Sequence, residues 1–175
     1  MVNKFLLLTL TALVTVSSLN SLKANVAHFE YITLKREVWE GREVLSDLYR
    51  LQPYIAQRQS EGGGCDLRVR KTAAFLSLYA SDLAAKRAGV RNLRDAGPFS
   101  VQVARATAMR RVRDVVVCAP LDGDMWFRLA QLSLALKAEP SKTETYLAWS
   151  VRTAPHEDRI KAPRTAFADR NLGSL

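Results

Sequence analysis

The acidic and histidine side chains that could do acid–base or metal chemistry lie in two short clusters. His156, Glu157 and Asp158 are consecutive and could supply a general acid and a general base. Asp122-Gly123-Asp124 begins like a calcium-binding loop but lacks the remaining ligands and the closing glutamate. Acidic residues are also favoured where a helix begins, because its N-terminus carries a partial positive charge. We interpret both clusters as helix starts and predict no catalytic residue, metal ligand or cofactor site.

The sequence also lacks the motifs of the common enzyme classes. The glycines at 62–64 are followed by Cys65, without the Lys and Ser or Thr that complete a phosphate-binding loop. Neither a Gly-x-Ser-x-Gly nor a His-Glu-x-x-His pattern occurs. We therefore predict that the protein is not an enzyme.

Residues 1–24 are typical of a targeting segment. Lys4 precedes an apolar run over 5–16, and two serines follow, as in a secretory signal. No Ala-x-Ala cleavage pattern follows, and the apolar character continues to Ala24, giving about the 20 residues that a membrane-spanning helix needs. We expect a signal peptide or, in preference, a single uncleaved transmembrane anchor. Either interpretation places residues 25–175 outside the cytoplasm.

The two cysteines, Cys65 and Cys118, are consistent with export. An even number of cysteines in an oxidising compartment favours a disulfide, and two buried thiols are the alternative. Neither cysteine has a second cysteine or a histidine pair near it, so the sequence does not indicate a metal site.

Apolar residues recur at alternating spacings of three and four along most of the remaining chain, as in amphipathic helices. Three consecutive valines at 115–117 could belong to a strand, but no partner strand is recognisable, so we interpret them as helical. The predicted helices cover 27–51, 66–88, 98–119, a pair within 118–155, and 157–170 with a kink or interruption at Pro163. The expected fold class is all-α.

In the predicted pair, Asp122 or Asp124 is expected to cap the first helix. Ser141-x-x-Glu144 has the pattern of a capping box for the second. That second helix is expected to bury four residues, Leu147, Ser150, Val151 and Ala154.

Residues 118–155 resemble one tetratricopeptide repeat. Pro120 and Trp126 stand at the spacing of that family, whereas Ser133 replaces the family's Tyr and Pro155 comes one residue late. The resemblance implies that residues 25–175 form a TPR-like domain of stacked antiparallel helical hairpins. A concave groove in such repeats usually binds a peptide or a helix.

Pro-Leu-Asp-Gly-Asp-x-Trp at 120–126, Ala-Pro-His-Glu at 154–157 and the N-terminal segment are together similar to small exported proteins of Gram-negative bacteria. Those proteins are associated with exopolysaccharide or O-antigen polymerisation and ligation. The resemblance implies a non-catalytic scaffold or adaptor at the inner membrane, with its domain facing the periplasm. The implied partner is an envelope protein such as a glycan polymerase or ligase.

Three aromatic residues of the repeat, Phe127, Tyr146 and Trp149, are the candidate partner-binding residues. We expect them to be exposed in the groove; the alternative is that they pack in the core.

Basic residues give a second hypothesis. The chain has 26 Lys and Arg against 17 Asp and Glu, a formal net charge of +9. On the helix predicted from Pro98, Arg105 lies off the apolar stripe, and Arg110 and Arg113 are one turn apart. These arginines are expected either to bind an acidic polysaccharide or anionic lipid, or to form an ordinary solvated face. Export makes nucleic acid a poor partner. A third hypothesis, a glycan-processing enzyme, would need paired carboxylates that the sequence does not identify.

Overall fold

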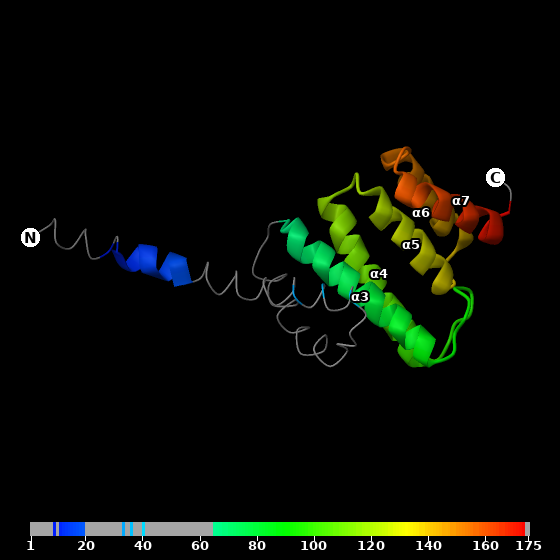
Figure 1. Ribbon diagram of the computed structural model, residues 1–175, viewed down its shortest axis with the longest axis horizontal. Helices are drawn as coiled ribbons and strands as arrows, with labels where there is room; N and C mark the ends of the chain where they lie inside the picture. Colours follow the sequence, from blue (N-terminus) through cyan, green and yellow to red (C-terminus); the bar gives the residue numbers. More distant parts are fainter. Residues whose placement is uncertain are drawn as a thin grey trace, which may run out of the picture. The chain divides into compact units, whose positions relative to one another are not determined.

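Every regular element in the described part of the chain is a helix, which confirms the all-α fold class. The computed structural model describes residues 9, 11–19, 33, 36, 40 and 65–173. The chain divides into two compact units, Met1–Ala56 and Gln57–Leu175. The second unit contains α3 (Leu67–Arg87), α4 (Phe99–Cys118), α5 (Gly123–Ala135), α6 (Pro140–Thr153) and α7 (Asp158–Asn171), shown in Figure 1.

The predicted targeting segment at 1–24 is described only at residues 9 and 11–19, which are helical. The rest of that segment, and the helix predicted over 27–51 apart from residues 33, 36 and 40, lie outside the described residues. No helix among the described residues is both long enough and apolar enough to cross a bilayer.

A disulfide joins the beginning of α3 to the end of α4, as the sequence predicted. The sulfurs of Cys65 and Cys118 are bonded, and their Cα atoms are 5.4 Å apart. Because Cys65 precedes α3 and Cys118 ends α4, the two helices run antiparallel (Figure 1).

The main core lies where α3, α4 and α5 meet. The valines at 115–117 are helical, as expected; Val115 and Val116 point into this core, whereas Val117 is exposed. The buried members of the cluster are Ala74, Ala108, Met109, Val112, Val115, Val116, Leu129 and Leu132.

Small and hydroxyl side chains hold α5 against α6. Ser150 Oγ donates to the carbonyl of Gly123 at 2.6 Å, and Thr143 Oγ1 donates to Ser133 Oγ at 3.1 Å. The first contact joins the start of α5 to the end of α6 and the second joins the end of α5 to the start of α6, so these helices also run antiparallel. A Cβ atom added to Gly123 would lie 2.3 Å from Cβ of Ala154, so this crossing needs glycine.

Four arginines donate hydrogen bonds to carbonyl groups near the C-terminal ends of other helices. Carbonyl groups in the last turn lack intrahelical partners, and the helix dipole favours a cation there. The bonds are Arg70 to Asp114 at 3.0 Å, Arg94 to Asn171 at 2.7 Å, Arg105 to Ala135 at 3.2 Å, and Arg164 to Ser150 at 2.5 Å and to Ala154 at 2.8 Å.

The helix starts agree with the sequence in part. The carboxylate of Asp122 caps α5 by accepting from the Met125 amide at 3.1 Å, as expected. The capping box predicted at 141–144 is wrong: α6 begins earlier, at Pro140, and its N-cap Glu139 makes no side-chain capping bond. Proline at the first helical position needs no partner for an N–H and has a helical φ already.

Two further predictions are wrong. Val151 of α6 is exposed, not buried, because no element covers its side of the helix among the described residues. Of the kink or interruption predicted at Pro163, the interruption is wrong, since α7 continues through this residue from Asp158 to Asn171, and the kink stays a prediction. Pro163 lies in the second turn of α7, where the helix tolerates one missing N–H bond.

The disulfide is expected to contribute strongly to stability. Replacing both cysteines (C65A/C118A) should lower the free energy of unfolding by about 4 kcal/mol, because the bond closes a loop with a sequence separation of 53. Urea unfolding followed by circular dichroism should show the same loss for the reduced wild-type chain. Equal midpoints for the oxidised, reduced and substituted chains would contradict this prediction.

The buried guanidinium of Arg164 is expected to matter more than exposed arginines. Arg164→Met would remove the hydrogen bonds that this buried guanidinium donates to the carbonyl groups of Ser150 and Ala154 and should cost about 2–4 kcal/mol of unfolding free energy. The control is Arg159→Met, which removes an exposed pair with Glu157 and should cost at most about 0.5 kcal/mol. Similar losses in the two variants would refute the capping role.

Candidate functional site

Three aromatic rings from α5 and α6 stack in a row. The ring centroid of Trp126 lies 6.0 Å from that of Tyr146 and 5.6 Å from that of Trp149, with interplanar angles of 29° and 22°. Tyr146 and Trp149 are three residues apart on α6 and so share one face of that helix. The indole N–H of Trp126 donates to the Pro120 carbonyl at 2.7 Å, which fixes the central ring.

Two arginines border these rings. Arg113 of α4 donates from Nη2 to the Tyr146 hydroxyl at 3.4 Å, and the guanidinium carbon of Arg152 lies 5.2 Å from the Trp149 ring centroid. Both arginines are exposed, and 40% of Trp149 is exposed. We call these five residues, Arg113, Trp126, Tyr146, Trp149 and Arg152, the aromatic–arginine surface.

The structure thus brings together residues from two separate sequence hypotheses. Tyr146 and Trp149 are expected to bind a partner protein and Arg113 an anion, yet all three lie on one surface. Trp126 and Arg152 are the members that sequence reasoning did not select. The sequence spacing could have identified Arg152, since it stands three residues after Trp149 on the same helix.

Phe127 does not belong to this surface, and the expectation that it is exposed is wrong. Only 3% of it is exposed, and its ring packs edge-to-face on Phe167 of α7 at 5.7 Å. It lies in a second core cluster with Ala130 and Leu147. Successive residues of a helix point about 100° apart, so Phe127 faces Phe167 while the half-buried Trp126 faces the rings of Tyr146 and Trp149.

Arg105 is also wrongly predicted, because it is buried rather than part of a charged surface. It is 3% exposed, and its Nη1 donates to the carbonyl groups of Asp95 at 2.6 Å, Ala96 at 3.4 Å and Ala135 at 3.2 Å. Arg110 is exposed and makes no hydrogen bond or ion pair within the described residues. Of the three predicted anion-binding arginines, only Arg113 reaches the aromatic rings.

The two acidic clusters begin helices, as the sequence predicted. Asp122 caps α5 and also pairs with Lys71 at 2.7 Å. Glu157 is the N-cap residue of α7 and pairs with Arg159 at 3.1 Å. No three His, Cys, Asp or Glu side chains converge on a possible metal position in the part of the chain that the structure describes.

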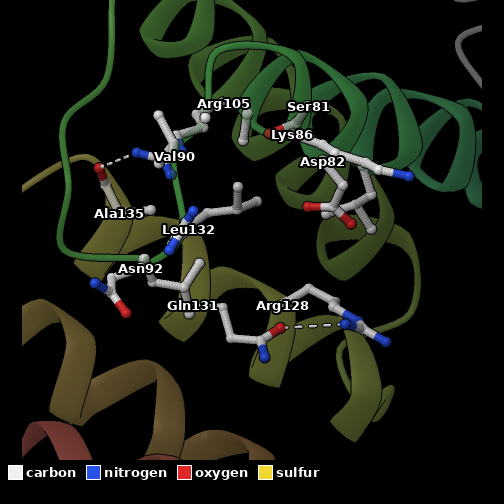
Figure 2. Close-up of a pocket in the computed structure, with 15 residues that line it drawn as sticks. Ser81, Asp82, Lys86, Val90, Asn92, Arg105, Arg128, Gln131, Leu132 and Ala135 are labelled. Carbon is white, nitrogen blue, oxygen red and sulfur yellow. Dashed lines mark hydrogen bonds between the residues drawn. The ribbon is translucent and has the colours of Figure 1, made fainter.

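A separate hollow of about 620 Å³ lies between α3, the segment after it and α5. Asp82 faces it from α3, and Arg128 and Gln131 face it from α5 (Figure 2). Sequence reasoning missed this hollow because its lining residues are scattered and form no motif. The lining is Leu78, Ser81, Asp82, Ala85, Lys86, Gly89, Val90, Arg91, Asn92, Leu93, Arg105, Arg128, Gln131, Leu132 and Ala135.

Asp82 carries the one carboxyl group in the lining of the hollow, and its surroundings shift its pKa. The pKa of Asp82 is raised above its usual range because the surrounding protein displaces part of its water, although the residue keeps contact with solvent. The guanidinium groups of Arg128 and Arg105 act in the opposite direction.

Comparison with models of known protein families, with curated proteins and with solved structures finds no match to this chain.

Because Phe127 is buried and Trp149 is partly exposed, replacing each by alanine should lower the free energy of unfolding by different amounts. Phe127→Ala should cost about 3–5 kcal/mol of unfolding free energy, because it empties a buried site. Trp149→Ala should cost only about 1 kcal/mol, the stacking contribution of a partly exposed ring. Urea unfolding of both variants checks this, and an equal or larger cost for Trp149 would contradict the assignment.

Proposed function

We propose that this protein is a non-catalytic periplasmic adaptor that binds a partner protein in envelope polysaccharide assembly. The aromatic–arginine surface is the observation that supports this proposal. Tryptophan, tyrosine and arginine are the residues most enriched among those that dominate binding energy at protein interfaces. Here three stacked rings and two guanidinium groups are gathered from three helices.

The surface is suited to binding because its side chains are ordered before a partner arrives. The Trp126 indole is held by its bond to Pro120, and Trp149 is held between ring stacking and the nearby Arg152 guanidinium. A side chain that is already ordered loses less conformational entropy on binding. The partner surface that fits would offer apolar contacts to the rings and acidic groups to the arginines.

The rest of the proposal depends on the resemblance. α5 and α6 fall within 118–155 and pack antiparallel, as a single tetratricopeptide-type hairpin would. We propose that the helices stack as TPR-like hairpins and that residues 1–24 tether or export the domain. The proposed location is the bacterial inner membrane, with the domain in the periplasm, and the proposed partner is a glycan polymerase or ligase.

A direct interaction with acidic glycan or anionic lipid is the alternative. The exposed Arg110, Arg113 and Arg152 favour it, because they present cationic groups without covering acidic partners among the described residues. Such binding would weaken steeply as salt rises, whereas contact through aromatic rings would persist.

A photoreactive amino acid in place of Trp149 tests the adaptor hypothesis in cells that assemble the polysaccharide. We expect cross-linking to a glycan polymerase or ligase, and none from the exposed α7 position Lys161. In pull-downs, W149A/R152A should reduce recovery of that partner about tenfold or more. The control R159A removes one exposed arginine elsewhere and should leave recovery unchanged.

Recovery of the partner should survive about 0.5 M salt, where charge interactions at the surface are strongly screened. Loss of recovery at that salt, together with salt-sensitive binding to anionic vesicles or acidic glycan, would replace the adaptor hypothesis by the alternative. Equal cross-linking from positions 149 and 161 would contradict a specific surface.

A further inference from the structure

We propose that the hollow between α3 and α5 binds an acidic saccharide unit, with Arg128 facing the ligand's carboxylate and Asp82 accepting hydrogen bonds from its hydroxyl groups. The site is separate from the aromatic–arginine surface. The inference therefore stands or fails independently of whether that surface binds a partner protein.

The size of the hollow suits a small ligand. Its volume of about 620 Å³ lies within the range of roughly 300–1,000 Å³ that is usual for small-molecule sites. Beside the hollow, buried Arg105 joins the C-terminal end of α5 to the segment before α4. Its bond to Ala135 is drawn in Figure 2. Arg105 is a positioning residue, since its bonds to carbonyl groups hold it away from a ligand.

The charges of the hollow favour an anion. Asp82 is the one acidic side chain in the lining, against three cations besides Arg105, namely Lys86, Arg91 and Arg128. Arg128 is oriented by a bond from Nη1 to Gln131 at 3.2 Å and by Asp124, 3.7 Å from its Nε. Its Nη2 makes no hydrogen bond among the described residues and is available to a carboxylate.

The uncharged lining favours a ligand with several hydroxyl groups. Ser81, Asn92 and Gln131 offer donors and acceptors, as a sugar requires. Asp82 accepts no hydrogen bond from any residue that the structure describes, so its oxygens are available to a ligand. Partial desolvation raises the pKa of the Asp82 carboxyl, although the residue stays in contact with solvent.

The apolar lining fits a sugar better than a nucleotide. Leu78, Val90 and Leu132 can contact the C–H groups of a pyranose ring. No aromatic ring lines the hollow in the described part of the chain, so a nucleobase would lack a stacking partner.

Calorimetric titration of the full-length chain with α-1,4-digalacturonate, at about 0.15 M salt, tests the proposal. We expect binding of digalacturonate but not of α-1,4-galactobiose, which has the same linkage and lacks the carboxylates. Arg128→Gln should weaken binding about tenfold or more, as expected for a lost charge-assisted hydrogen bond. The matched control Arg159→Gln removes the same charge from α7, outside the lining, and should leave binding unchanged.

The Asp82→Asn variant tests whether the ligand binds through hydrogen bonds to its hydroxyl groups or only through attraction between its charge and the cations of the hollow. This variant makes the hollow more positive, so unspecific anion binding would become tighter, whereas our proposal predicts several-fold weaker binding. Because Asp82 is exposed, its replacement should not unfold the protein, so weaker binding would not result from misfolding. Thermal unfolding of each variant checks this. The proposal is overturned by absent digalacturonate binding, by equal effects of the two arginine variants, or by equal affinity for galactobiose or inorganic phosphate.

Discussion

The structure of the helical unit depends on guanidinium groups that bond the C-terminal carbonyl groups of neighbouring helices. Arg105 does this for α5 and Arg164 for α6, and both are buried. A buried cation is costly unless it is fully hydrogen-bonded, so each of these contacts permits few orientations of the helix that receives it. Arg70 and Arg94 make the equivalent contacts to α4 and α7. With the disulfide, they connect α3–α7 through contacts far more directional than apolar packing.

Because some arginines form these internal contacts, not every arginine counted in the net charge is available to bind an anion. A net charge of +9 suggests a surface for anions, but some of the arginines serve inside the protein. The expectation that Arg105 lies off the apolar stripe of α4 is wrong, because it stands four residues after Val101 and three before Ala108, on the buried face of the helix. Arg110 and Arg113 lie on the exposed side. The acceptor of the Arg105 bond, the carbonyl of Ala135, is thirty residues away and is brought to it only by the fold. The arginines relevant to binding are those that remain after this structural set is removed.

The sequence was sufficient for properties that depend on local pattern. The extents of α3 and α4 follow from apolar periodicity, and Asp122 as the cap of α5 follows from its place before an amphipathic run. The disulfide followed from cysteine number and the expected compartment. Phe127 could not be assigned, because deciding between groove and core requires knowing that Phe167 of α7 covers that side of α5. The hollow was inaccessible for the same reason, since its lining comes from separate elements.

α5 connects all of these features through three consecutive residues. Trp126 joins the outer rings, Phe127 fills the core and Arg128 faces the hollow, because successive side chains diverge by about 100° around a helix. The rotation of α5 is fixed at its start by the close contact of Gly123 with α6 and at its end by Arg105. A turn of the helix large enough to displace Trp126 would also move Phe127 against Phe167. The aromatic–arginine surface and the hollow therefore both depend on the packing of Phe127. Neither site can be repositioned by rotating α5 without repacking the core between them.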